Sequence, residues 1–484
     1  MWADLAWQFD YFARPHGAYL LGEYHVGGRW LYFPVAFAVK TSLPVLALLL
    51  AATSRSLKDL TQGGAQGFRQ SKNQSQFVGP ATPFLWLPIL IYTLISLSTP
   101  LNIGYRHLLP LLPFLYLWLA QQGAGWLHGR LLPPFIALLL FISLFTWPNY
   151  LPYFNRLVGQ NGWHILSDSN LDWGQDLPTL AEWQAQNPNQ SLFLSYFGMS
   201  RPSAYGVRFT PLPTWSPAPE QGDPARQPFY PPDPAPGVYA ISVTNLQGVV
   251  LGTNPDTYAY FRPLEPLARL GGSIFLYEVA PRGRATHLAL SGLVPADLPA
   301  AWHALWQTND VQIRWFNAAT SLIWPAGQES WLATAVGSAE TAAPLLQPFW
   351  PATPTAQANG YTLTQFAPPT LPFAAAEAVP MGESLTFLGQ MHLQTDDSYQ
   401  IVTGWRVEQA TTRPLKLFIH LLNADGQIIS QWDGLDVAPH SWQAGDIFLQ
   451  AHTLPFNEET AVQLRLGTYD GETQTRLGEV LLQP

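Results

Sequence analysis

The sequence predicts a membrane α-helical region of about four transmembrane helices, followed by an extracytoplasmic α/β region and a C-terminal antiparallel β-sandwich. Three observations lead to this fold class. Four long apolar stretches lie within residues 1–150. Charged residues make up 11% of the 484 residues, whereas a typical soluble protein has about 25%. Short runs of alternating apolar and polar residues recur from residue 385 onward, as in antiparallel strands.

The helical region is defined by its apolar stretches. A helix needs roughly 17–25 mostly apolar residues to cross the hydrocarbon core of a bilayer. Stretches of this kind cover residues 31–53, 81–98, 101–120 and 131–147. We therefore expect a transmembrane domain over residues 31–147, preceded by an extracytoplasmic or interfacial segment at residues 1–30.

The orientation of this domain follows from its loops, because short cytoplasmic loops are enriched in Lys and Arg. Basic residues outnumber acidic ones in the loops after the first and third stretches. These basic residues are Arg55, Lys58, Arg69, Lys72 and Arg130. The prediction is a multi-pass protein of the cell membrane whose large C-terminal region is extracytoplasmic, with the lipid bilayer as one partner.

Charge and composition exclude several classes of function. Residues 151–484 contain 14 basic and 28 acidic side chains, so this region has no excess of basic groups to neutralise nucleic-acid phosphates. The chain contains no cysteine, which excludes disulfides, thiolate metal sites and a cysteine nucleophile. We therefore expect no nucleic-acid partner.

Four further regions follow the apolar stretches. Strand and helix patterns alternate after residue 148, a Pro- and Ala-rich stretch comes later, and seven strand-like runs with no helix between them end the chain. Such a series of strands indicates a β-sandwich. The expected regions are an extracytoplasmic α/β domain at 148–282, a second small α/β unit at 283–343, a linker at 344–380 and the sandwich at 385–484. Within the first of them, ten prolines at residues 211–236 predict an extended surface loop.

The polar string DSNLDWGQDL at residues 168–177 is the first candidate site. Its carboxylates can bind a divalent cation or a sugar, and carboxylates before a helix also cap its N-terminus. A calcium loop is excluded, because Trp173 and Thr179 occupy the positions where such a loop needs Gly and Glu. Both alternatives stay open, with no metal site assigned and a divalent cation as the one candidate cofactor. The candidate residues are Asp168, Asn170, Asp172 and Asp176.

Ionisable residues in the apolar stretches form the second candidate site. Lys40, Arg106 and His107 lie there, and an ionisable side chain within a membrane is costly and by default indicates a site. The guanidinium group of Arg matches the geometry of phosphate oxygens. These three residues are therefore candidate contacts to a lipid-linked phosphate, with simple extension toward the lipid headgroups as the alternative.

Several strings, in order, carry a resemblance to a known family. They are YLLGEYHVGGRWLYFPVAFAVKTSLPVLALLL at 19–50, LSTPLNIGYRHLLPLLPFLYL at 97–117, the string YLPYFNRL, and SDSNLDWGQDLPTL at 167–180. Residues 1–280 resemble the C-terminal half of bacterial polytopic glycosyltransferases, namely the protein mannosyltransferase group of the GT-C superfamily (family 39-like).

The resemblance implies transfer of a sugar from a polyprenyl-phosphate donor to an extracytoplasmic acceptor, either a glycan or a protein. It also implies that Lys40, Arg106 and His107 contact the donor phosphate or the membrane interface. In that family the catalytic carboxylate lies in the first outer loop of a longer chain, and no position here matches it. The catalytic residue is therefore unknown, and we expect this chain to lack the catalytic N-terminal loop and to be inactive alone.

A second class of function stays open beside the enzyme. The chain can be a non-catalytic, membrane-anchored surface protein whose β-sandwich binds a glycan or a protein. In that case Trp405, Trp432 and Trp442 form a stacking platform for sugar rings, whereas core packing is the other role for such residues.

Overall fold

The computed structural model describes residues 16–483 with internal gaps. The gaps are 63–81, 124–130, 216–217, 223–226, 253, 328–329, 352, 374–377, 395–397, 412 and 456–462. Residues 1–15 of the predicted interfacial segment, and the predicted loop residues Arg69, Lys72 and Arg130, lie outside the described residues. The chain divides into two compact units. Unit 1 contains Met1–Gln221 and Gly237–Glu278, and unit 2 contains Gly222–Pro236 and Val279–Pro484.

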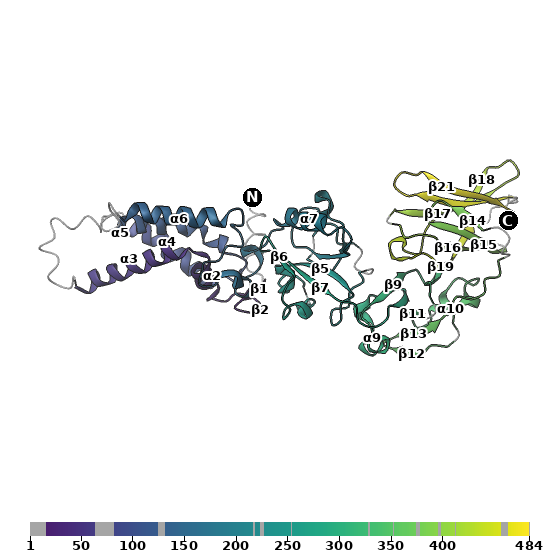
Figure 1. Ribbon diagram of the computed structural model, residues 1–484, viewed down its shortest axis with the longest axis horizontal. Helices are drawn as coiled ribbons and strands as arrows, with labels where there is room; N and C mark the ends of the chain where they lie inside the picture. Colours follow the sequence, from purple (N-terminus) through teal and green to yellow (C-terminus); the bar gives the residue numbers. More distant parts are fainter. Residues whose placement is uncertain are drawn as a thin grey trace. The chain divides into compact units, whose positions relative to one another are not determined.

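Unit 1 begins with a short hairpin and a group of helices that lie side by side (Figure 1). The elements are β1 (Gly17–Leu20), β2 (Glu23–Val26), α2 (Tyr32–Lys40), α3 (Leu43–Gln62), α4 (Thr82–Ser98), the 3₁₀ helix η1 (Tyr105–Leu111), α5 (Leu112–Gly123) and α6 (Leu132–Thr146). Helix α2 ends at Lys40 because Thr41 is extended, with ψ 137°. Pro44 then lies in the first turn of α3, where a missing N–H is tolerated.

The predicted fold class is wrong in its four transmembrane helices. Among the described residues, no single helix is both long and apolar enough to cross a membrane. The predicted span 31–53 is broken, because α2 and α3 meet at a bend of 116°. The predicted span 101–120 begins with irregular and 3₁₀ residues, so its α-helix α5 has only 12 residues. The apolar stretches of α4 and α6, Phe84–Ser98 and Leu132–Thr146, are shorter than 18 residues.

The helices of unit 1 bury one side and expose the other. A small apolar core among α3, α4 and α5 includes Ala52, Ile89 and Trp118. The exposed Trp86 packs edge to face against Trp118, with 5.1 Å between ring centroids. None of the residues of α6 is buried. This helix therefore presents an apolar surface that the described residues of unit 1 leave partly uncovered.

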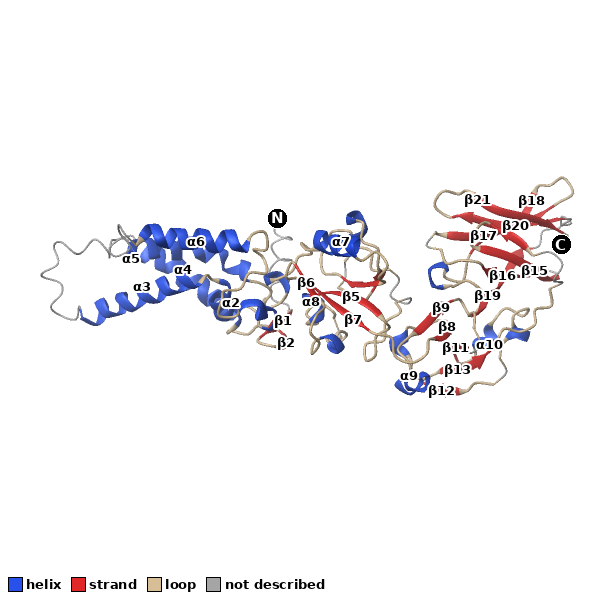
Figure 2. Cartoon of the chain, in the orientation of Figure 1, coloured by secondary structure: helices blue, strands red, loops and turns tan. Residues whose placement is uncertain are grey.

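The second part of unit 1 is a five-stranded sheet in the order β4-β3-β5-β7-β6 (Figure 2). Its strands are β3 (Leu192–Ser195), β4 (Thr210–Pro211), β5 (Gly237–Ser242), β6 (Ala268–Leu270) and β7 (Ile274–Val279). Strand β3 runs parallel to β4 and β5, and β6 and β7 form an antiparallel pair. The helices here are η2 (Gly159–His164), η3 (Asp168–Asn170), α7 (Leu177–Gln186), η4 (Pro202–Tyr205), α8 (Val243–Leu246) and η6 (Ala259–Phe261). Leu177 and Leu180 fix α7 in the core beside these strands, and both are fully buried.

Unit 2 contains a mixed sheet in the order β12-β13-β11-β8-β9. Its strands are β8 (Thr286–Leu290), β9 (Val311–Trp315), β11 (Ser330–Ala335), β12 (Ala356–Ala358) and β13 (Tyr361–Phe366). Strand β8 is parallel to β9 and β11, whereas β13 is antiparallel to its neighbours. The helices beside it are η7 (Pro295–Asp297), α9 (Ala300–Trp306), α10 (Ser338–Thr341) and η8 (Gln347–Phe349).

The rest of unit 2 consists of two antiparallel sheets, in the orders β10-β19-β16-β15-β14 and β18-β17-β20-β21. The strands are β10 (Ser321–Trp324), β14 (Val379–Met381), β15 (Leu385–Gln394), β16 (Ser398–Val407), β17 (Leu415–Leu422), β18 (Ile428–Gly434), β19 (Ile447–Pro455), β20 (Gln463–Asp470) and β21 (Arg476–Leu482), with the 3₁₀ helix η9 (Pro439–Ser441) before β19. Leucine, isoleucine and aromatic side chains from both sheets share one core. Strand β10 comes from the range predicted as a second α/β unit, and β12 and β13 come from the predicted linker.

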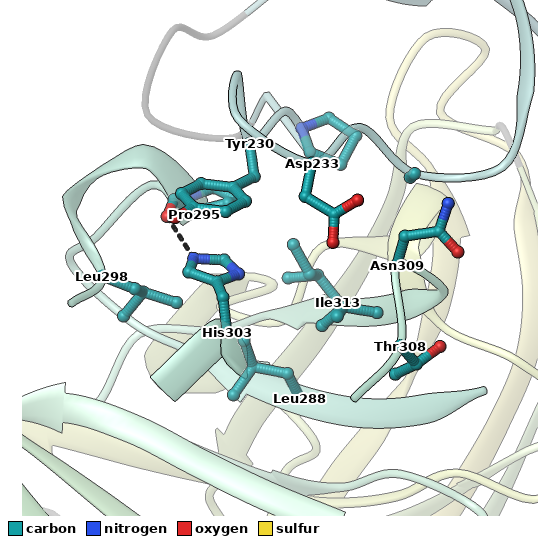
Figure 3. Close-up of a pocket in the computed structure, with 12 residues that line it drawn as sticks. Tyr230, Asp233, Leu288, Pro295, Leu298, His303, Thr308, Asn309 and Ile313 are labelled. Atoms are coloured by element: carbon teal, nitrogen blue, oxygen red, sulfur yellow. Dashed lines mark hydrogen bonds between the residues drawn. The ribbon is translucent and has the colours of Figure 1, made fainter. Parts of the chain in front are cut away.

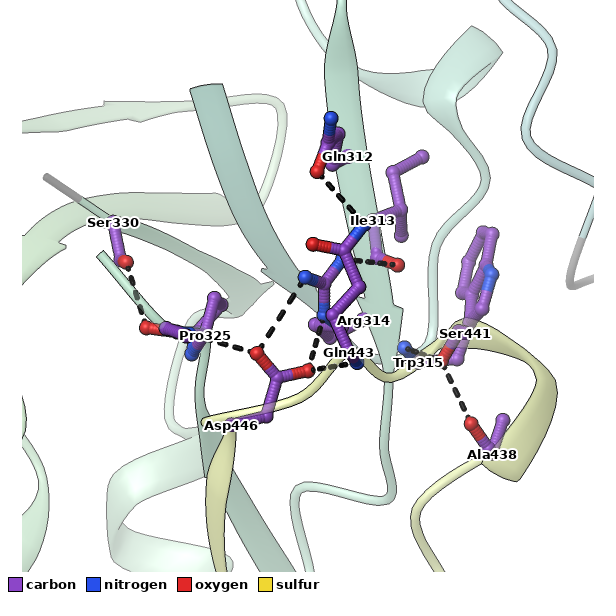
Figure 4. Close-up of polar contacts among 11 residues, drawn as sticks. Gln312, Ile313, Arg314, Trp315, Pro325, Ser330, Ala438, Ser441, Gln443 and Asp446 are labelled. Atoms are coloured by element: carbon purple, nitrogen blue, oxygen red, sulfur yellow. Dashed lines mark hydrogen bonds and ion pairs between the residues drawn. The ribbon is translucent and has the colours of Figure 1, made fainter. Parts of the chain in front are cut away.

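A buried ion pair connects the mixed sheet with the sandwich (Figure 4). The Arg314 Nε on β9 donates to the Oδ2 of Asp446, at 2.5 Å, and the two side chains are 1% and 0% exposed. The same carboxylate accepts backbone N–H groups from Ala326 and Gln443, each at 2.7 Å. The carboxylate is thus fully satisfied, as a buried charge requires.

Candidate functional site

The polar loop of residues 168–177 is tied to the helical region through Asn170. Its Oδ1 accepts the backbone N–H of Tyr105 at 2.8 Å, and its Nδ2 donates to the Tyr32 hydroxyl at 2.8 Å and to the Ser167 carbonyl at 3.0 Å. The side chain is 1% exposed. Asn170 therefore anchors the loop to α2 and η1.

Lys40 also holds this junction together. Its ammonium group donates to the carbonyl oxygens of Leu151 and Tyr153, each at 2.8 Å, and to that of Asn170. It lies 4.2 Å from the ring centroid of Phe154. An ammonium group has three N–H donors, so each of them has an acceptor here and none is left for a phosphate.

Arg106 and His107 are placed differently from Lys40. The Arg106 side chain is exposed, and its guanidinium carbon lies 5.1 Å from the ring centroid of Trp173 in the polar loop. Within the described part of the chain, no hydrogen-bond or ion-pair partner of this guanidinium is found. The buried Nε2 of His107 likewise has no partner among the described residues. Arg106 and His107 are consecutive in η1, but Arg106 lies over Trp173 in the polar loop and His107 packs against Phe33 in α2.

An apolar cavity adjoins this pair. It has a volume of about 240 Å³ and is lined by side chains of α2, α4, η1 and α5, among them Phe33, Phe37, Ile89, Leu97 and Leu108. The His107 ring packs edge to face against Phe33, at 6.4 Å between centroids. The structure therefore brings Arg106, whose guanidinium has no hydrogen-bond or ion-pair partner among the described residues, and an apolar cavity to the same end of the helical region.

The three aspartates of the polar loop differ in burial and in hydrogen-bond partners. Asp168 is half-buried and has φ 58°, and burial raises its pKa to about 6. Asp172 is fully buried, and burial raises its pKa to about 8, so this carboxyl group is protonated at neutral pH. Its Oδ1 accepts the Gly174 N–H at 2.9 Å, and its Oδ2 has no partner among the described residues.

Asp176 does not cap the helix that follows it. No side-chain capping hydrogen bond is formed at the start of α7. Instead its Oδ2 accepts the Ser273 N–H at 3.0 Å and the Ser273 hydroxyl at 2.7 Å. Over the described ranges, no group of three or more His, Cys, Asp or Glu side chains is arranged to hold a metal ion.

The tryptophans of the sandwich lie in or against its core. Trp405 and Trp442 are each 1% exposed, and both rings stack near Phe448. The half-buried Trp432 packs edge to face against His452 at 4.3 Å. The rings of Trp405 and Trp442 are therefore packed in the core and not available to a sugar, whereas Trp432 is only partly covered.

A second recess, which no sequence pattern indicated, lies in unit 2 (Figure 3). Part of the proline-rich segment passes over α9 there, and the Tyr230 ring stacks on the His303 ring with 3.4 Å between centroids and an interplanar angle of 4°. Below the stack is a small pocket of about 20 Å³. Beside it an open groove of about 430 Å³ is lined by Asp233, Arg282 and Thr308, among others. Prolines alone predicted only an extended loop, because proline composition does not say what a segment packs against.

Comparisons with known proteins do not name a family. No family model matches the chain, and no curated protein matches it. One solved structure, described as the C-terminal domain of wzt, aligns with 24% of this chain and 81% of its own at 16% identity, with a TM-score of 0.18. A TM-score this low supports no conclusion about fold or function.

Proposed function

We propose that unit 1 binds a lipid-linked phosphate, as the donor-binding part of a glycosyltransferase that uses a polyprenyl-phosphate sugar at the cell membrane. One observation carries the proposal: the exposed Arg106, whose guanidinium has no hydrogen-bond or ion-pair partner among the described residues, lies two positions before Leu108, which lines the apolar cavity. An amphiphile of this kind needs an apolar space for its chain and a cation for its headgroup. The resemblance of residues 1–280 to polyprenyl-phosphate-dependent enzymes supports the same ligand.

The phosphate contact is assigned to Arg106, with His107 as its neighbour in η1. A guanidinium donates paired hydrogen bonds to phosphate oxygens, and the Trp173 ring below it favours the cation and limits its rotation. The His107 Nε2 is buried and has no partner among the described residues, and its ring packs against Phe33, so His107 is assigned to the wall of the site and not to a hydrogen bond with the headgroup. Lys40 is likewise not assigned a phosphate contact, because its ammonium group holds the polar loop in place through the Asn170 carbonyl.

Exposed apolar side chains on two helices support contact with a lipid bilayer. Soluble proteins rarely expose large contiguous apolar patches. On α4 and α6 the exposed residues include Phe84, Leu87, Leu90, Ile91, Leu94, Ile95, Leu138, Leu140, Phe141, Leu144 and Phe145. We infer that lipid covers these faces and that the remaining regions lie on the extracytoplasmic side.

The proposed reaction moves a sugar from the lipid phosphate to a hydroxyl of a glycan or protein acceptor. The bond between the sugar C1 and the phosphate oxygen breaks, and the phosphate leaves with the electron pair. A new bond forms between C1 and the acceptor oxygen, whose proton passes to a base. Arg106 stabilises the charge on the departing phosphate, and no residue of this chain is assigned as the base.

The test compares two arginine variants in the full chain. Undecaprenyl phosphate in detergent micelles is titrated into the wild type, Arg106→Gln and Arg156→Gln, the last being an exposed arginine of the same unit. A hydrogen bond to a charged group contributes about 1.5–3 kcal/mol, so Arg106→Gln should bind at least about tenfold more weakly while the control is unchanged. Equal binding of undecaprenol, which has no phosphate, contradicts the proposal.

A further inference from the structure

We infer that the groove beside the Tyr230 and His303 stack in unit 2 binds a neutral hexopyranose unit of a glycan. This site is separate from Arg106 and its cavity, and the inference does not rest on the lipid-phosphate proposal. It starts from the groove of about 430 Å³ between the proline-rich segment and α9. A recess with a few converging polar groups is the ordinary form of a small-molecule site.

The groove is held in shape by a buried amide. Asn309 is 5% exposed, and its Nδ2 donates to the carbonyl oxygens of Pro234 and Ala280, at 3.2 and 3.0 Å. Its Oδ1 accepts the Arg282 N–H at 2.7 Å. The hydrogen bonds of Asn309 therefore hold the segment around Asp233 in place before a ligand binds, which reduces the entropy cost of binding.

The imidazole of His303 has a defined tautomer. Its Nε2 lies 3.0 Å from the Pro295 carbonyl oxygen, and a carbonyl only accepts, so Nε2 has the proton. Burial lowers the pKa of His303, and the ring is neutral at physiological pH. Its Nδ1 is consequently a lone-pair acceptor for a hydroxyl group.

Among the described residues that line the groove, Asp233 and Arg282 have opposite charges. The Asp233 Oδ2 accepts from Arg282 Nη2 at 2.5 Å, and the two side chains are 26% and 62% exposed. The pair cancels in net charge but offers both an acceptor and a donor to a third group. This combination suits the alternating donors and acceptors of vicinal hydroxyls and gives no preference for an ionic ligand.

Apolar surface completes the fit to a sugar ring. The Tyr230 ring, Pro232, Ala300 and Ala304 line the same groove. A pyranose has C–H groups that pack on such surface while its hydroxyls reach the polar side. Amphipathic aromatic side chains such as Tyr commonly occupy sites of this mixed character.

The experiment uses the full chain and two matched alanines on α9. Both Ala301 and Ala304 are exposed, but only Ala304 lines the groove. Ligand-observed NMR with methyl glucopyranoside, mannopyranoside and galactopyranoside should show binding to the wild type and to Ala301→Trp. Ala304→Trp fills the groove and should abolish the signal.

A second variant tests the chemistry of the groove rather than its shape. Asp233→Ala removes a charged hydrogen-bond acceptor and should weaken binding by about tenfold or more, and Arg106→Gln should leave sugar binding unchanged. The inference is overturned if none of the three glycosides binds the wild type. It is equally overturned if binding survives in both Ala304→Trp and Asp233→Ala, since the sugar then sits elsewhere.

Discussion

Lys40 and Arg106 are cations in apolar stretches, yet their surroundings give them different roles. The Lys40 ammonium is saturated by carbonyl oxygens more than a hundred residues away in the chain. Arg106 is exposed over an aromatic ring. A sequence shows that both are costly to bury, but only tertiary contacts show which one has donors to spare.

The buried carboxyl group of Asp172 predicts how the free energy of unfolding depends on pH. Its native pKa is raised to about 8 by burial, above about 3.9 in an unfolded chain. Between these values the native state holds a proton that the unfolded state lacks. The stabilisation that this carboxyl group gives the native state is therefore fully present below about pH 4. As the pH rises toward 8, this part of the free energy of unfolding is lost, by up to about 1.4 kcal/mol per pH unit.

Asp172→Asn replaces this carboxyl group with a neutral amide of similar shape. We expect the free energy of unfolding of the wild type to fall between about pH 6 and 8, and that of the variant to fall less. Denaturant unfolding at several pH values measures both. The pKa of Asp168 is raised only to about 6, so its effect on the free energy of unfolding is lost mainly below pH 6. If the free energies of unfolding of the wild type and the variant fall in parallel between pH 6 and 8, Asp172 is ionised in the native state and the prediction is wrong.

At the scale of elements, β9 and the start of β19 depend on the Arg314–Asp446 pair (Figure 4). Asp446→Asn leaves a buried guanidinium without its counter-charge, and loss of one partner of a buried pair typically destabilises a protein by about 3–5 kcal/mol. We expect a loss of this size in the unfolding free energy of unit 2. Thermal and denaturant unfolding of the full chain measure it.

The exposed pair of Arg476 and Glu479 is the matched control. Its atoms approach to 2.7 Å, but the side chains are 52% and 44% exposed. Glu479→Gln should change stability by less than about 1 kcal/mol. Because the buried pair is poorly screened, the Asp446→Asn effect should persist in about 1 M salt, and equal effects of the two substitutions would contradict this account.

For the molecule as a whole, residue pattern indicated strands better than it indicated helix length. The alternating runs after Leu385 correspond to strands β15 to β21, because alternation directly reports a half-buried strand. Apolar length did not report continuous helices, since the break at Thr41 and the 3₁₀ turn at Tyr105 divide stretches of uniform hydropathy. The edge strand β10 was also assigned to another region, because its partner β19 lies more than a hundred residues later.

The sequence likewise indicated some residues of the candidate sites and not others. The sequence proposed the polar loop and Arg106 as candidates, because both stand out by residue type in an apolar setting, and their role stays a prediction. It did not identify Asp233, His303 or Arg282, which are ordinary surface residue types until folding brings them around one groove. Nor did it distinguish a ligand role from packing for the sandwich tryptophans, two of which are buried.

The membership of Gly222–Pro236 in unit 2 has a consequence for synthesis. This segment leaves the ribosome before strands β5 to β7 of unit 1. It also comes long before His303, on which Tyr230 stacks, and Asn309, which donates to Pro234. Domains tend to fold as they emerge, so the second part of unit 1 is synthesised while this segment still lacks its partners in unit 2. The groove is therefore among the later features to assemble, from an early stretch of chain and a later one, and a nascent chain paused before residue 303 has no groove at all.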